Sequence, residues 1–314
     1  MALQNFLSDS FIFSVTETPP DSIPTNAKCF VGCPVWACDG WVGSLYSSSK
    51  RRTWLSEYSE VFPTVEGNST FYAMPTIGTV KRWADETRPG FRFALKFPRV
   101  ISHDCRLQHA QEETGLFIEA LEVLQQCDRL GPSFLQLPPS FSGKQFTVLE
   151  SYLRQLPREL PFAVEVRHLD FFQHSPHDDR LNELLFELGM DRVIFDSRAL
   201  YSNAPSDECE EASQSRKPDL PVRPVAIGNR PLVRFVGRNS VDETQPWIEE
   251  WTPVIAEWID RGKTPYVFTH SPDDLYAPQF AARFIRELRN LSPQVAALPE
   301  RWPGQNIRRQ QKLF

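Results

Sequence analysis

Short apolar segments alternate with amphipathic segments along most of the chain. Eight segments are rich in β-branched and aromatic residues and have strand length; they cover residues 29–36, 63–71, 91–98, 132–138, 161–168, 191–198, 231–236 and 265–270. Seven segments repeat apolar residues at helical spacing, over 50–61, 76–87, 112–130, 145–155, 178–188, 244–261 and 277–291. A segment of this helical kind follows every strand except the sixth. The alternation predicts parallel strands joined by crossover helices.

Eight βα units in about 260 residues match the size of a closed barrel. We therefore predict an α/β fold, a (β/α)8 TIM barrel in a single domain. A doubly wound open sheet is the alternative. No glycine-rich loop follows the first predicted strand, as a dinucleotide-binding sheet of that kind requires.

Three segments depart from the barrel pattern. Residues 1–28 show little periodicity, which predicts an N-terminal extension before a barrel over 29–297. Residues 199–230, between the sixth and seventh strands, hold an acidic, serine-containing run followed by prolines, and they predict a surface insertion at the barrel end that carries active sites. Residues 298–314 predict a basic C-terminal tail.

Composition narrows the class of protein. The 314 residues carry 34 Lys+Arg against 40 Asp+Glu, a net charge of −6, which argues against a dedicated nucleic-acid or membrane-surface binder. No segment has the roughly 18 apolar residues of a membrane span, so we expect a soluble, cytoplasmic protein. Six cysteines without a C-x-x-C pair predict free thiols. No cofactor or metal is expected, and the sequence leaves the oligomeric state open.

Strand alternation makes the predicted lumen polar. Alternate residues of a barrel strand face inward, and catalytic groups gather at the carboxyl ends of the strands. We predict Glu66, Lys96, Glu165 and Asp196 as catalytic residues. We predict that the substrate is bound by Asn68, Tyr72, Arg99, Gln136, Arg167, His168, Arg234 and His270. Charged side chains are rarely buried without partners, so the charged members of this set must pair with one another, hold a ligand, or both.

An ordered series of motifs resembles the YecE-like family, domain of unknown function 72, over roughly residues 29–290. The motifs are Glu66-Gly-Asn68-Ser-Thr-Phe-Tyr72, Gly90-Phe-Arg-Phe-Ala-Leu-Lys96, Gln136-Leu-Pro-Pro139 and Glu165-Val-Arg167-His168. The resemblance implies a TIM barrel and a family without an established reaction. The sequence departs from the family at Val236, where histidine is usual, and at Thr269-His270, where asparagine or aspartate is common.

The first functional hypothesis is an enzyme that acts on a small polar or anionic substrate without a metal. Lys96, Arg167 and Arg234 would bind a phosphate or carboxylate, and Glu66 or Glu165 would act as general acid or base. Hydrolysis, isomerisation and lyase chemistry all remain open. A glycoside hydrolase is one case of this hypothesis, and the distance between the two glutamates would test it.

Two other hypotheses come from different classes. A metal-dependent barrel, like endonuclease IV or xylose isomerase, would take its ligands from Glu66, Glu165, Asp196, His168 and His270, although neighbouring cations oppose a metal. A non-catalytic nucleic-acid-binding module would need a basic rim despite the net negative charge. That rim would consist of Arg99, Arg106, Arg198 and Arg238.

Overall fold

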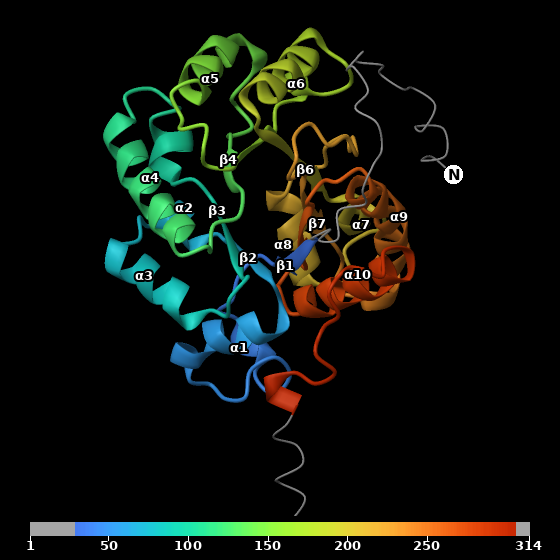
Figure 1. Cartoon of the computed structure of the whole chain (residues 1–314). Coiled ribbons are helices and arrows are strands. Elements are labelled where there is room, and N and C mark those ends of the chain that lie inside the picture. The colour runs from blue at the N-terminus through green and yellow to red at the C-terminus, as the bar shows by residue number, and fades with distance from the viewer. Residues whose placement is uncertain (1–28, 306–314) are drawn as a thin grey trace, which may run out of the picture.

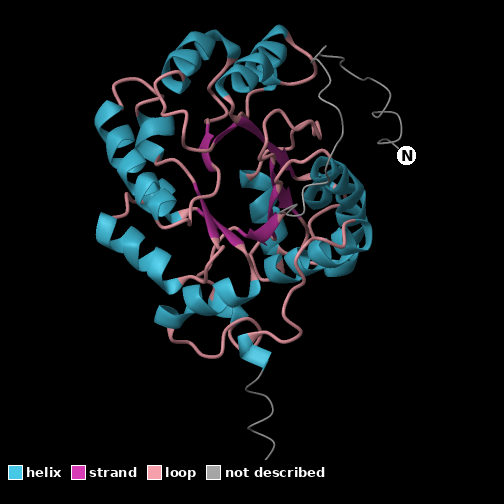
Figure 2. Cartoon of the chain, in the orientation of Figure 1, coloured by secondary structure: helices cyan, strands magenta, loops and turns pink. Residues whose placement is uncertain are grey.

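Eight parallel strands surround a central axis in the computed structural model, which describes residues 29–305 (Figures 1 and 2). Their order around the sheet is β3-β2-β1-β8-β7-β6-β5-β4, and the parallel bridges Phe93↔Leu130 and Lys96↔Phe134 join the two ends. The predicted (β/α)8 barrel is therefore confirmed. The strands are β1 Phe30–Cys33, β2 Thr64–Gly67, β3 Arg92–Leu95, β4 Ser133–Gln136, β5 Phe162–Glu165, β6 Asp191–Asp196, β7 Leu232–Val236 and β8 Tyr266–His270.

Most of the helices form a ring outside the strands (Figure 2). Local sequence signals set their ends: α6 begins after Ser175, whose side chain accepts from the Asp178 amide, and ends at Gly189 with φ 68°. The helices are α1 Trp54–Val61, α2 Ser69–Tyr72, α3 Ile77–Glu86, α4 Gln111–Gln126, α5 Phe146–Leu153, α6 Pro176–Leu188, α7 Arg198–Tyr201, α8 Glu208–Arg216, α9 Val241–Asp260 and α10 Ala277–Leu291.

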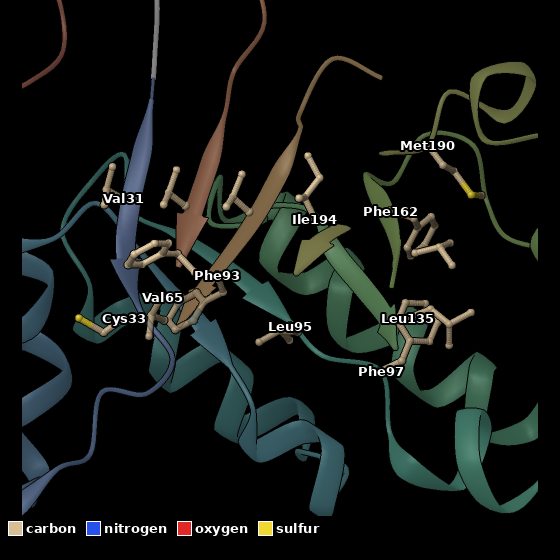
Figure 3. Close-up of a cluster of buried hydrophobic side chains, with 14 of the residues drawn as sticks. Val31, Cys33, Val65, Phe93, Leu95, Phe97, Leu135, Phe162, Met190 and Ile194 are labelled. Carbon is tan, nitrogen blue, oxygen red and sulfur yellow. The ribbon is translucent and has the colours of Figure 1, made fainter. Parts of the chain in front are cut away.

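Strand alternation builds two separate cores. Outward-facing residues such as Val65, Phe93 and Ile194 pack between the strands and the helices (Figure 3). A smaller cluster fills the lower lumen; its residues are Phe30, Ala94, Phe134, Ala163, Val193, Leu232, Tyr266 and Phe268. The lumen is thus closed at its base, and polar side chains are left to its carboxyl end.

The structure corrects two expected elements. The second strand ends at Gly67, and α2 begins at Ser69, so Asn68 precedes a helical turn instead of lying in a strand. The segment 199–230, which shows no helical pattern, contains most of α7 and all of α8. Helix α8 begins at a cap in which the Asp207 side chain accepts from the Glu210 amide, a local signal that periodicity does not capture.

The predicted extension, residues 1–28, and residues 306–314 of the predicted tail lie outside the described residues. Between these limits, no helix is long and apolar enough to cross a bilayer.

Candidate functional site

A chain of ion pairs crosses the carboxyl end of the lumen. Arg234 on β7 meets Glu66 on β2 through two contacts, Nε to Oε2 at 2.8 Å and Nη2 to Oε1 at 2.7 Å. Its Nη1 donates to Glu165 Oε2 on β5 at 2.7 Å, and Arg167 Nε donates to Glu165 Oε1 at 2.8 Å. Gln136 on β4 accepts from Arg167 Nη2 at 2.9 Å. Glu66, Glu165, Arg167 and Arg234, all predicted site residues, therefore satisfy one another.

Both glutamates of the ion-pair chain, Glu66 and Glu165, are held ionised. Burial alone would raise the pKa of Glu66, but the Arg234 charge outweighs it and holds the pKa well below its ordinary value. At Glu165 the charges of Arg234 and Arg167 likewise outweigh burial and lower the pKa to about 2. A carboxylate of this kind neither carries a proton at neutral pH nor accepts one readily. The predicted acid or base role thus gains no support at either glutamate.

Lys96 shares the lumen but stands outside the ion-pair chain. It follows β3, is 8% exposed, and its Nζ lies 3.9 Å from the ring centroid of Phe71 on α2. Within residues 29–305 its amine has neither an ion pair nor a hydrogen bond. Burial first, and then the Arg234 charge, lower the pKa of Lys96 to about 7. A large fraction of the amine is therefore neutral near pH 7.

Arg167 has capacity left for a ligand. Its Nε and Nη2 are engaged by Glu165 and Gln136, whereas its Nη1 has no protein partner in the described part of the chain. Among the lumen residues predicted from the sequence, the three cationic side chains Lys96, Arg167 and Arg234 outnumber the two carboxylates Glu66 and Glu165 when Lys96 is protonated. The excess cationic donors are suited to an anionic group.

His270, at a departure from the family pattern, belongs to this layer. It ends β8, and its Nε2 lies 3.4 Å from Glu66 Oε2 yet makes no hydrogen bond among the described residues. Burial lowers the pKa of His270, so the ring is neutral at pH 7. Asn68 also reaches Glu66, donating from Nδ2 to Oε1 at 2.6 Å. Of the predicted substrate-binding residues, Asn68, Gln136, Arg167, Arg234 and His270 therefore lie together.

Asp196, predicted to be catalytic, faces away from the lumen. Its Oδ2 accepts from Trp251 Nε1 on α9 at 2.6 Å and from Arg198 Nη2 at 2.8 Å. On β6 the lumen face belongs to Val193 and Phe195, and the Arg234 guanidinium lies 5.6 Å from the Phe195 ring centroid. The prediction gave β6 the wrong face, because the polar side of this strand, with Arg192 and Asp196, faces the helices, where Asp178 and Trp251 bind these side chains.

The remaining predicted binding residues, Tyr72, Arg99 and His168, follow the strands and lie outside the ion-pair chain. Tyr72 is 80% exposed and packs edge-on against Phe71. Arg99 pairs with Asp104 at 3.2 Å, and His168 accepts from the Asp170 amide as a helix cap. These contacts do not bring the three residues into the cluster around Lys96.

The alternative functions find less support in this geometry. The arginines of the proposed basic rim are engaged: Arg198 by Asp196 and Glu250, Arg238 by Glu210, and Arg106 by Ser140 and Gln145. Among described side chains, no three His, Cys, Asp or Glu residues are placed to hold a metal ion. The Arg234 guanidinium occupies the space between Glu66 and Glu165 and keeps both ionised, whereas a glycosidase needs one protonated carboxyl.

The insertion contributes residues that the site prediction omitted. Leu220 packs with the lumen-facing Phe195 and with Val236, so this segment covers one side of the barrel mouth. Lys217 precedes it and donates to Ser213 Oγ at 2.7 Å; burial lowers the pKa of Lys217 to about 8. No pattern in the sequence marks these positions, because the segment lacks both helical and strand periodicity. Phe71 contacts Lys96 and lies in the same family motif as Tyr72, the aromatic residue predicted to bind substrate.

Most of the sequence is similar to one family of known proteins. Residues 30–305 match the family described as protein of unknown function DUF72. The UPF0759 protein YecE of Escherichia coli K12 is 35% identical over 270 residues, covering 86% of this chain and 96% of that protein. The UPF0759 protein YunF of Bacillus subtilis is 24% identical over 227 residues, which cover 70% of this chain and 72% of that protein.

A solved structure agrees with the fold. The crystal structure of a DUF72 family protein from Enterococcus faecalis V583 has a TM-score of 0.62 and 20% identity, and it covers 83% of this chain and 98% of that one. The resemblance inferred from the motifs at Glu66, Lys96, Gln136 and Glu165 is confirmed by the family match. The chain therefore belongs to the DUF72 family.

Proposed function

We propose that this protein is an enzyme that acts on a small anionic molecule at the carboxyl end of the barrel, with the Lys96 amine as its reactive group. One observation carries the proposal. Lys96 is buried, has no acid partner in the part of the chain that the structure describes, and lies in a lumen where both carboxylates are bound by arginines. An unpaired buried amine is costly to stability, and such groups are typical of catalytic sites.

Each residue of the layer has a role in this proposal. Arg167 offers its unengaged Nη1 to an anionic group, because a guanidinium binds carboxylates and phosphates with directed donors. Arg234 ties Glu66 and Glu165 together across the lumen and holds the walls of the site in place. Lys96, neutral in part at pH 7, is the group able to accept a proton or attack carbon.

Ligand-dependent melting tests the anion site. We expect inorganic phosphate or a dicarboxylate such as malonate to raise the melting temperature at constant ionic strength, because a ligand that binds only the folded state stabilises it by about 2.7 kcal/mol at 100 times its Kd. Arg167→Ala should abolish this rise. The control Arg154→Ala removes an arginine that pairs with Glu150 and Glu187 on the outer surface. This variant should keep the rise in melting temperature.

Catalysis is tested with any anion that the melting experiment identifies. Lys96→Met should retain binding of that compound and lose its turnover, since the substitution removes the amine and leaves Arg167 in place. An equal anion response in Arg167→Ala and the unaltered protein, or unchanged turnover in Lys96→Met, would contradict the proposal.

A further inference from the structure

The Lys96 amine sits in surroundings that favour one kind of chemistry. An ammonium presents three donors, and the described residues supply no acceptor for any of them. Instead Nζ lies over the face of the Phe71 ring, at 3.9 Å from its centroid. That ring is fixed by edge contacts at 5.1 Å with Tyr72 and with His103. The site therefore supports a positive charge through an aromatic face, and within the described residues it offers the N–H donors of Lys96 no protein acceptor.

The charged and titratable groups around Lys96 come from three strands of the barrel and one turn. They are Glu66 on β2, Glu165 on β5 with Arg167 directly after it, Arg234 on β7, and His103 on the Val100–Asp104 turn. Both glutamates are bound to arginines. The amine thus faces two guanidinium groups without a carboxylate of its own, an arrangement that favours an unprotonated lysine nucleophile.

We infer that Lys96 forms a Schiff base with the carbonyl carbon of a small substrate that also carries a carboxylate, such as a 2-oxo acid. The inference rests on the proposed function, because Arg167 would bind the carboxylate while Lys96 reaches the adjacent carbonyl. An iminium has at most one N–H donor and spreads its charge over nitrogen and carbon, so it fits the Phe71 face better than an ammonium does. This favours covalent attack over a general-base role for the same amine.

The step balances without an oxidant or a reductant. The neutral Nζ lone pair forms a bond to the carbonyl carbon, and the oxygen takes a proton to give a carbinolamine. The C–O bond then breaks and water leaves, carrying the oxygen and the two amine hydrogens. One proton from solvent on the resulting imine nitrogen gives the iminium. The iminium withdraws electrons from the neighbouring C–C and C–H bonds, which is the chemistry that lyases and isomerases of carbonyl acids use.

Reductive trapping tests the inference. The unaltered protein is incubated with pyruvate or glyoxylate and sodium cyanoborohydride, and intact mass and peptide mapping locate the adduct. We expect one adduct per chain, on the peptide containing Lys96. Acetate, which lacks a reactive carbonyl, should give none. The exposed Lys50, Lys81 and Lys144 serve as internal references, because they lie at the surface and outside the lumen.

Two variants sharpen the experiment. Lys96→Arg keeps the cation but removes the nucleophile and should lose the adduct, whereas Lys144→Arg should keep it. Adduct formation on Lys96 should also increase as pH rises through about 7, the pKa that burial and Arg234 impose on this amine. Mapping of the unaltered protein decides the question even if Lys96→Arg does not fold.

The outcomes separate this inference from the function on which it rests. Absence of an adduct, or an adduct spread over the exposed lysines, overturns the Schiff base. If anions still raise the melting temperature and Arg167→Ala still abolishes the rise, the anion-binding enzyme stands with another role for Lys96. If neither the adduct nor the anion response appears, both proposals fail.

Discussion

Arg234 and Glu66 lie 168 residues apart in the sequence and form a two-contact ion pair across the barrel, with Nε to Oε2 at 2.8 Å and Nη2 to Oε1 at 2.7 Å. Glu66 is fully buried and Arg234 is 6% exposed. The pair therefore joins β2 to β7 through the lumen, in addition to the hydrogen bonds that join neighbouring strands.

Removing the arginine should strongly destabilise the barrel. Arg234→Met leaves Glu66 and Glu165 buried without their shared cation, and breaking a buried pair in this way costs about 3 to 5 kcal/mol. Urea denaturation measures the loss. Arg154→Met, at a partly exposed surface pair, should cost at most about 1 kcal/mol. Similar losses in the two variants would contradict a structural role for the buried pair.

Acid should weaken the protein partly through Glu165. Its pKa is lowered to about 2 in the folded chain, so between about 4.5 and about 2 the unfolded chain binds a proton that the folded chain does not. Stability from this group is present above that range and is lost as pH falls through it, by at most about 1.4 kcal/mol per pH unit. Urea midpoints at several acidic pH values should fall less steeply in Glu165→Gln. Glu122→Gln, at an exposed position on α4, should keep the original slope.

Lys96 should reduce stability at neutral pH. Its pKa is lowered from 10.5 to about 7, so the unfolded chain binds more protons between these values and stability rises with pH across this range. Lys96→Met lacks the buried amine and should exceed the unaltered protein in free energy of unfolding below about pH 7. The difference should shrink towards about pH 10. Urea denaturation at three pH values measures the difference in free energy of unfolding, with Lys81→Met, at an exposed position, as the control. A loss of stability in Lys96→Met would show that the amine is satisfied.

Asp196 should behave as a structural residue. Asp196→Asn weakens the contacts to Arg198 and Trp251, and hydrogen bonds to a charged group contribute about 1.5 to 3 kcal/mol. We expect a lower urea midpoint with an unchanged melting response to anions. Loss of the anion response in a folded Asp196→Asn protein would place this carboxylate in the site after all.

The sequence alone determined the barrel and most of its polar layer. Eight strand patterns with crossover helices allow few parallel arrangements, and period-two alternation assigns Glu66, Lys96, Gln136, Glu165 and Arg234 to the lumen because each has apolar neighbours on the opposite face. Helix boundaries were predictable where a proline in the first turn and the end of the apolar periodicity mark them. The helix predicted over 277–291, for example, coincides with α10.

Only the tertiary structure decided which of these charges pair and which one is left over. Strand periodicity gives the face on which a side chain lies, but not its position along the barrel axis or its partner. Arg234 bridges Glu66 and Glu165 only because the fold brings together strands that are far apart in the sequence. Asp196 shows the same limit, since the polar side of its strand faces the helices and not the lumen. The unpaired state of Lys96, on which the proposed chemistry rests, follows from three-dimensional packing because the carboxylates near it are already held by arginines.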